Sequence, residues 1–260
     1  LKGFYHKSKK LEVIHQSINK KKINFKLKEN LITFVGKLNS AKGFDIFGNA
    51  VIKILDKYPD WKSLVIGDEP RENISFNHKN LKNLGFQNHK KVLETFSKSS
   101  IAVACSRWEE PFGRTSLEAS ANGCAVIITD KGGLSETVTN AKILKKLNVK
   151  ELQKTINFLI KNNDQRKNLQ KLSIKNFYLT HKFVSANIDI YRDEKFKYTN
   201  LFNIKKNISL RILHVTNFNE RHDGRLFFNT GRRINNGLIR LGHSILEFSD
   251  RDIQKYYKNY

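Results

Sequence analysis

The chain has 260 residues, of which 48 are Lys or Arg and 24 are Asp or Glu, so its formal net charge is +24. Hydrophobic residues make up 39% and charged residues 28%, a globular balance that excludes wholesale disorder. Two cysteines cannot build a disulfide scaffold, and no apolar run is long enough for a membrane span. With no signal-like segment at the start, we expect a cytoplasmic protein in a reducing compartment.

The chain opens with a basic segment, residues 1–30, which has only two acidic residues and predicts a connector rather than a domain. From residue 31 onward, short apolar segments alternate with amphipathic ones. The expected strands are 31–35, 63–67, 80–84, 101–105 and 125–129. The expected helices are 44–57, 90–98, 114–122, 134–139, 149–161 and 164–178. This alternation predicts a Rossmann-like α/β domain over residues 31–180, with a parallel sheet flanked by helices.

Residues 181–208 are rich in aromatic and charged side chains and predict a closing helix followed by a linker. A strand, a helix and a second strand are then expected at 210–215, 229–241 and 244–248. Together they predict the start of a second β-α-β unit over 209–260, which is too short to bury a doubly wound core. Because no Met stands at position 1 or elsewhere, we expect a piece of a longer protein. The open strand edges predict that 209–260 docks on the preceding domain or self-associates with another copy.

The positive charge has two interpretations. Clustered cations are typical of surfaces that bind the phosphate backbone of a nucleic acid. Lysines outnumber arginines about three to one, however, and Asn, Ile and Phe are also abundant, which indicates a bias toward AT-rich codons. Specific phosphate and base contacts favour arginine, so we do not expect nucleic acid as a partner.

The first polar loop, residues 36–43, follows the first predicted strand and precedes a helix. Gly36 and Gly43 permit tight backbone turns, and Lys37 and Lys42 place two ammonium groups over the end of the strand. Two cations at this position suit a diphosphate, although the spacing is not that of a Walker A loop. The alternative is that both lysines are ordinary solvated surface.

The second loop, residues 106–119, places Glu110 ahead of a predicted helix that contains Glu118. Gly113 permits close ligand approach, and the free amides of 112–115 suit phosphate oxygens. On a continuous helix the two glutamates would lie roughly 12 Å apart, which matches the separation of a hexose and a ribose at the two ends of a diphosphate. The alternative is a capping-region acid and an ordinary helical glutamate.

The third loop contains Gly132 and Gly133 between a strand and a helix. Paired glycines either let backbone amides approach a ligand or only make the turn. Cys105 and Cys124 are expected to be small apolar fillers. Because neither the cysteines nor the histidines have metal-ligand spacing, no metal site is expected.

Together the three loops resemble the C-terminal, donor-binding domain of the retaining GT-B glycosyltransferases, of the glycosyl transferases group 1 type. That family has G-[RK]-L and a lysine-glycine pair after a strand, then two glutamates with seven intervening residues, then a G-G-x-x-E loop. Over residues 31–140 this sequence has, in the same order, Gly36-Lys37-Leu38 with Lys42-Gly43, Ser106 with Glu110-Pro111-Phe112-Gly113 and Glu118-Ala119, and Gly132-Gly133 with Glu136.

The resemblance implies transfer of a hexosyl group, with retention, from a UDP-sugar or GDP-sugar to a glycan or lipid acceptor. Neither a cofactor nor a metal is implied. Lys37 and Lys42 would neutralise the donor diphosphate, and Glu110 would contact the transferred sugar, so these three are the implied catalytic residues. Lys37 stands where the family usually has arginine, which keeps the charge but loses the forked geometry.

The resemblance also implies a donor-binding set. Glu118 would hold the ribose, Leu117 would line the nucleotide, and the amides of 112–115 would contact the sugar and the phosphates. The full implied set is Gly36, Phe112, Gly113, Arg114, Thr115, Leu117, Glu118, Gly132 and Gly133.

The ends of the chain fit the same resemblance. Residues 13–18 resemble the segment that joins the two GT-B domains, residues 181–195 resemble the closing helix, and residues 210–248 resemble the start of a second GT-B N-terminal domain. The chain would then supply the donor half of one enzyme and be inactive alone, with peripheral contact at the inner face of an anionic membrane.

Two other functions stay open. A basic, non-enzymatic module would bind nucleic acid or anionic membrane through its lysines. A GT-B phosphorylase would use pyridoxal phosphate, but no lysine can be assigned to the Schiff base that this cofactor requires.

Overall fold

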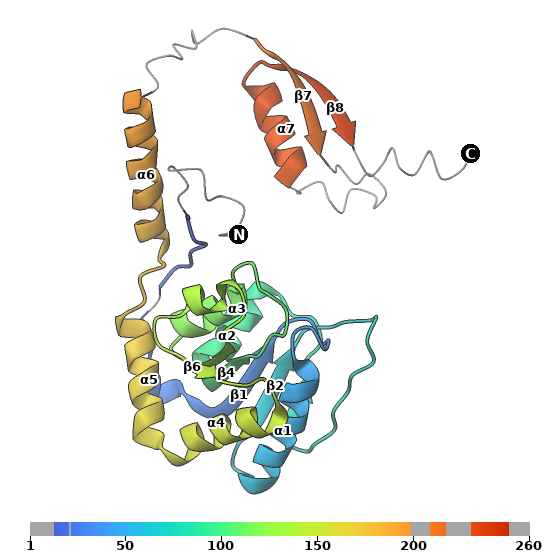
Figure 1. Cartoon of the computed structure of the whole chain (residues 1–260), viewed down its shortest axis with the longest axis vertical. Coiled ribbons are helices and arrows are strands. Elements are labelled where there is room, and N and C mark those ends of the chain that lie inside the picture. Colours follow the sequence, from blue (N-terminus) through green and yellow to red (C-terminus); the bar gives the residue numbers. More distant parts are fainter. Residues whose placement is uncertain (1–12, 21, 199–208, 217–229, 250–260) are drawn as a thin grey trace, which may run out of the picture. The chain divides into compact units, whose positions relative to one another are not determined.

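The computed structural model describes residues 13–20, 22–198, 209–216 and 230–249 (Figure 1). The chain divides into two compact units, Leu1–Asp193 and Glu194–Tyr260, and each is described by itself. The predicted linker after the closing helix and the loop before the last helix lie outside the described residues.

The first unit is built on a six-stranded parallel sheet with the strand order β3-β2-β1-β4-β5-β6. Its strands are β1 (Glu29–Val35), β2 (Lys62–Ile66), β3 (Leu81–Asn83), β4 (Ser99–Ala104), β5 (Ala125–Thr129) and β6 (Lys142–Leu144). The strand order reverses between β1 and β4, and open α/β sheets bind ligands outside the carboxyl ends of strands at such a switch point. The predicted Rossmann-like parallel sheet is confirmed.

Helices cover both faces of this sheet (Figure 1). The covering helices are α1 (Phe44–Lys57), α2 (His89–Lys98), α3 (Arg114–Ala121), α4 (Val149–Lys161) and α5 (Asn163–Lys175), and α6 (His181–Tyr198) follows them along the chain. On one face, α1 and α4 pack against a core that contains Ile32 and Ile127. On the other face, α2 and α3 pack against a core that contains Ala102 and Val126. Successive strand residues point to opposite faces, so the strands are apolar on both sides.

Three local differences from the predicted elements have physical causes. The expected helix at 134–139 is a short 3₁₀-helix, Gly133–Thr137. The edge strand β6 was not predicted, because three residues carry too little pattern. Helix α5 ends at Lys175 rather than 178, because the chain turns there and buries Phe177 against Leu117.

The second unit contains β7 (Arg211–Thr216), α7 (Thr230–Arg240) and β8 (Ser244–Ser249), with β7 parallel to β8. These are the three elements of the expected β-α-β unit. In the described part of the chain, no helix has the length and apolarity needed to cross a bilayer.

Lys28, directly before β1, joins the ends of two helices. Its ammonium group donates to the carbonyl oxygens of Phe96 at 2.9 Å, Ser99 at 2.8 Å and Asn122 at 2.7 Å. These carbonyls lie at the C-terminal ends of α2 and α3, where the helix dipole favours a positive charge. Burial lowers the pKa of Lys28.

Replacing Lys28 with methionine should leave these carbonyls without their donor and lower the free energy of unfolding by about 2 kcal/mol. Urea denaturation of the parent chain and the variant measures this difference. Lys26→Met is the matched control, since Lys26 is exposed on the preceding 3₁₀-helix, Phe25–Leu27. An equal loss in both variants would contradict the capping role.

Candidate functional site

Two adjoining hollows lie at the carboxyl end of β1, beside the start of α3. Their volumes are about 260 Å³ and about 440 Å³, and both are lined by Val35, Gly36, Arg114 and Thr115. The structure therefore brings the first and second predicted loops together, at the edge where the strand order reverses.

The predicted charged residues divide between the two hollows. Lys42 and Glu110 line the smaller one, together with Gly113. Lys37 and Glu118 line the larger one. Lys37 is exposed and has neither an ion-pair nor a hydrogen-bond partner among the described residues, so its charge is available to an anionic ligand.

Lys42 and Glu110 form an ion pair across the smaller hollow. The Glu110 side chain is 10% exposed and the Lys42 side chain 31% exposed. The backbone amide of Lys42 also donates to Asn39 Oδ1 at 3.0 Å, which fixes the turn that carries the lysine. A ligand anion entering here would compete with Glu110 for the ammonium group, and the freed carboxylate could accept hydroxyl groups.

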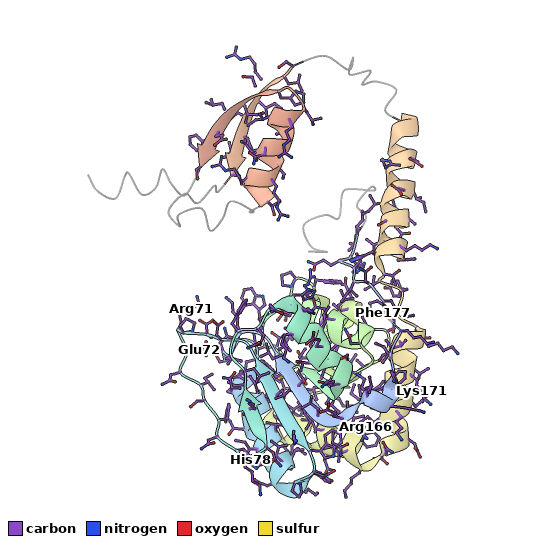
Figure 2. The ribbon with its side chains drawn as sticks, turned by 180° about the vertical axis from the view of Figure 1, so that it is seen from behind. Arg71, Glu72, His78, Arg166, Lys171 and Phe177 are labelled. Carbon is purple, nitrogen blue, oxygen red and sulfur yellow. The ribbon has the colours of Figure 1, made fainter. Side chains whose placement is uncertain are left out.

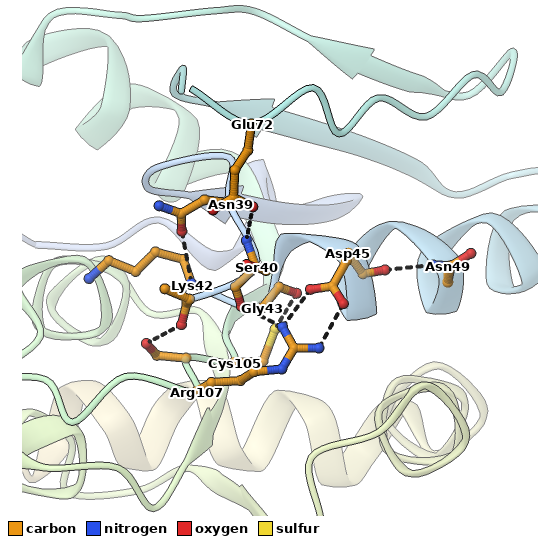
Figure 3. Close-up of polar contacts among 11 residues, drawn as sticks. Asn39, Ser40, Lys42, Gly43, Asp45, Asn49, Glu72, Cys105 and Arg107 are labelled. Carbon is orange, nitrogen blue, oxygen red and sulfur yellow. Dashed lines mark hydrogen bonds and ion pairs between the residues drawn. The ribbon is translucent and has the colours of Figure 1, made fainter. Parts of the chain in front are cut away.

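The first loop is braced by the loop after β4 (Figure 3). The Arg107 guanidinium donates to both carboxylate oxygens of Asp45, each at 2.6 Å, and its backbone amide donates to the carbonyl of Ala41 at 2.8 Å. From the other side, the amide of Ser40 donates to Glu72 at 2.8 Å. The lysine-bearing turn is thus held at both ends before any ligand binds, which is the preorganisation that an anion site needs.

The Arg107–Asp45 pair should make stability depend on acid pH. The hydrogen bond from Arg107 lowers the pKa of Asp45, so the pair stabilises the fold above the ordinary Asp pKa, and this contribution is lost as pH falls through the lowered pKa. Asp45→Asn should cost roughly 0.5 to 1 kcal/mol at neutral pH, because such exposed pairs are screened by water.

Urea denaturation at about pH 7 and about pH 3 tests this, since the difference between parent and Asp45→Asn should shrink at the lower pH. A difference that stays constant between the two conditions would contradict it.

Gly43 and Cys105 mark the closest approach of the two loops. Gly43 begins α1 with a φ of +73°, and a Cβ added there would lie 2.0 Å from the carbonyl oxygen of Cys105. Cys105 and Cys124 are both buried free thiols, and burial raises the pKa of Cys105 to about 12. Both are unreactive core fillers, as the sequence predicted.

The start of α3 has the features expected of a phosphate-binding helix N-terminus. Gly113, with a φ of +98°, is the N-cap residue, and no side chain caps the helix. The first amides of a helix have no intrahelical acceptor, and the helix dipole favours an anion there. However, α3 begins only at Arg114, so Glu110 is not on the helix and the predicted 12 Å helical separation from Glu118 does not apply.

Gly132 and Gly133 are turned toward the protein rather than toward the hollows. The amide of Gly132 donates to the Glu109 carboxylate and that of Gly133 to the carbonyl of Glu110, each at 2.6 Å. A Cβ at Gly132 would lie 2.2 Å from the Glu110 carbonyl oxygen, and one at Gly133 2.8 Å from the Phe112 Cα. Of the two alternatives left open, the structure favours a turn that positions the Glu110 segment over direct amide contact with a ligand.

Leu117 needs a correction. It is 1% exposed and packs in an apolar cluster with Ile18 and Phe177, so it lines neither hollow. Phe112 is partly buried against the same cluster, and its ring centroid is 5.6 Å from that of His15. Leu117 and Phe112 therefore belong to the apolar packing beneath the site.

His89 is the site residue that sequence reasoning missed. Glu118, whose side chain is 5% exposed, accepts at Oε1 from Arg114 Nε at 2.7 Å and from His89 Nε2 at 2.9 Å. His89 lines the larger hollow with Phe86. No motif marks it, but it begins α2 directly after the loop that follows β3 at the same sheet edge, and that position was the available signal.

Comparison with known proteins agrees with this geometry. The sequence pattern of the family described as "Glycosyl transferases group 1" matches residues 15–176. Spore coat protein SA of Bacillus subtilis (strain 168) is 28% identical over 162 residues, which cover 56% of this chain and 43% of that protein. The lipopolysaccharide core biosynthesis mannosyltransferase LpsB of Rhizobium meliloti (strain 1021) is 33% identical over 115 residues, which cover 40% of this chain and 32% of that protein. The matches thus span less than half the length of these relatives.

Solved structures share the fold. Anabaena HepE in complex with UDP-glucose has a TM-score of 0.53 and 19% identity, over 64% of this chain and 49% of that chain. Sucrose-phosphate synthase from Thermosynechococcus elongatus has a TM-score of 0.60 and 18% identity, over 76% of this chain and 56% of that chain. Since the family pattern covers well over half of the 260 residues, the chain belongs to the glycosyl transferases group 1 family.

Proposed function

We propose that this chain supplies the donor-binding half of a retaining, metal-independent glycosyltransferase. The donor is a UDP-sugar or GDP-sugar, and the acceptor is a glycan or lipid. The observation that carries the proposal is the convergence of Lys42, Glu110 and the uncapped start of α3 on one hollow, with Lys37 and Glu118 in the next.

In this proposal the sugar occupies the smaller hollow, the diphosphate lies where the two hollows adjoin, and the nucleoside occupies the larger one. When the bond between the sugar and the diphosphate breaks, negative charge develops on the leaving diphosphate. Lys42, Lys37 and the first amides of α3 stabilise that charge, which is the electrostatic role that a metal ion plays in other enzymes. The sugar carbon bonds to the acceptor oxygen, whose proton is released. Glu110 holds hydroxyl groups of the sugar, and the Glu118 carboxylate accepts from the ribose.

The relatives support a nucleotide-sugar donor. HepE was solved with UDP-glucose, and LpsB is named a mannosyltransferase. Because the chain matches less than half of such proteins, we expect little transfer by the chain alone. We also place the enzyme at the cytoplasmic face of an anionic membrane, a location that its net charge of +24 favours.

Calorimetry with UDP, GDP and their glucose and mannose esters tests the proposal. We expect saturable binding to the folded chain and loss of affinity in Glu118→Gln, which removes the charge but keeps the shape. If the chain has the circular dichroism spectrum of a folded α/β protein but does not bind any of these ligands at millimolar concentration, the proposal is wrong. Binding to polyanions that falls steeply with salt and is unaffected by Glu118→Gln would instead support a basic binding module.

A further inference from the structure

A third cavity lies at the opposite edge of the sheet from the two hollows. Its volume is about 490 Å³, and it is lined by residues at the amino ends of three strands: Asn30 in β1, Trp61 before β2 and Ser100 in β4. The remaining walls come from the segment before β1, the segment between α1 and β2, the end of α4, and α5. We call it the amino-edge cavity. No motif of the donor site falls there.

Positive charge is concentrated on this cavity. Four cations line it, Lys28, Arg166, Lys167 and Lys171, against one carboxylate, Asp60. That carboxylate already accepts from Asn30 Nδ2 at 2.8 Å. A concave surface lined by one sign of charge focuses its field and raises the local concentration of counter-ions.

Lys28 already donates to three carbonyl oxygens, so the three lining cations of α5 are the ones that face a ligand. Arg166 is 8% exposed, its Nη1 donates to the carbonyls of Leu159 at 2.7 Å and Ile160 at 3.3 Å, and its Nη2 donates to Asn163 Oδ1 at 2.7 Å, so it contributes mainly positive charge rather than free donors. Its Nε has no hydrogen-bond partner in the described structure. Lys167 and Lys171 are exposed, lie one turn apart on α5, and have no partner among the described residues. Figure 2 marks Arg166 and Lys171 on this helix.

Aromatic side chains also line the cavity. Phe25, Tyr58 and Trp61, which we call the aromatic wall, line it. The Arg166 guanidinium lies over the Trp61 ring at 5.0 Å and Trp61 is 3% exposed, so the half-buried Phe25 and Tyr58 offer the more accessible ring faces. Aromatic walls accept planar rings by stacking, and the cations that line the same cavity accept an anionic group.

We propose that the amino-edge cavity is a second ligand site, for a small organic phosphate that carries a flat ring. The phosphate lies between Lys167 and Lys171, near the Arg166 guanidinium, and the ring packs against the aromatic wall. Because the cavity opens at the far edge of the sheet, this ligand and the sugar-nucleotide donor bind without competing. The proposal does not depend on the proposed transferase activity.

Phenyl phosphate is the probe, and Trp61 is the reporter. The chain has two tryptophans, so Trp108→Phe leaves Trp61 as the fluorophore. We expect a saturable change in its fluorescence with phenyl phosphate at millimolar concentration or below, and a weaker response to inorganic phosphate or to phenol alone. The response should persist in Lys42→Ala, which disables the donor site but not this one.

Two charge-reversal variants on α5, one inside the cavity and one outside it, test whether the lysines bind the phosphate. Lys171→Glu should weaken phenyl phosphate binding about fivefold to tenfold, because it replaces an attraction by a repulsion. Lys175→Glu makes the same change one turn further along, at a residue that does not line the cavity, and should change binding less than about twofold. Equal weakening by the two variants, or no saturable response in the parent, would overturn the proposal.

Discussion

Replacing Lys42 with alanine is expected to weaken UDP or GDP binding about 10-fold to 100-fold, the loss of one charge-assisted contact to a diphosphate. Lys42 lines the smaller hollow and is 31% exposed, so it can reach a ligand while water screens it only partly. Calorimetry with each nucleotide measures the change. Lys42→Arg should keep most of the affinity because it keeps the charge.

Two controls separate this effect from general loss of charge or fold. Lys131 is also ion-paired, to Glu109 at 2.9 Å, but lines neither hollow, so Lys131→Ala should change affinity less than about twofold. Removing Lys42 also leaves Glu110 unpaired, and the double variant Lys42→Ala/Glu110→Ala separates that penalty from the lost ligand contact. If Lys131→Ala weakened binding as much as Lys42→Ala, the site assignment would be wrong.

Most of the sheet could be predicted because its strands are buried on both faces. The segment Ala125–Thr129 is apolar throughout except for its last residue, and its predicted and observed bounds agree. The edge strand β6 (Lys142–Leu144) has neither the length nor the two-sided burial that makes such a pattern visible. Sequence pattern therefore predicts the centre of a doubly covered sheet better than its edges.

The sequence predicts which loops form the site, but it does not predict which side chains contact one another there. The strand ends place Lys42 and Glu110 at one edge of the sheet, yet nothing in their 68-residue separation predicts that they pair. The contact of His89 with Glu118 likewise depends on how α2 packs beside α3. The choice between the two roles of Gly132 and the buried position of Leu117 depend on the same thing, since a motif gives residue types and only packing decides which way they face.

Gly43→Ala should be one of the most damaging single substitutions in the site. The added Cβ would lie 2.0 Å from the backbone oxygen of Cys105, and a backbone atom cannot move aside as a side chain can. The left-handed φ of +73° adds its own strain. We expect a loss of about 3 to 5 kcal/mol in the free energy of unfolding, measured by urea denaturation.

Gly85→Ala is the matched control, because Gly85 has a similar φ of +63° but no atom within 4 Å of the added Cβ. Its cost should be that of the backbone conformation alone, about 1 kcal/mol. The difference between the two variants therefore measures how closely the lysine-bearing loop must lie against the end of β4. If the variants lose equal stability, that approach is not required for folding. If Gly43→Ala is the less stable, as we expect, the molecules that remain folded should also bind UDP more weakly, because Lys42 is the adjacent residue.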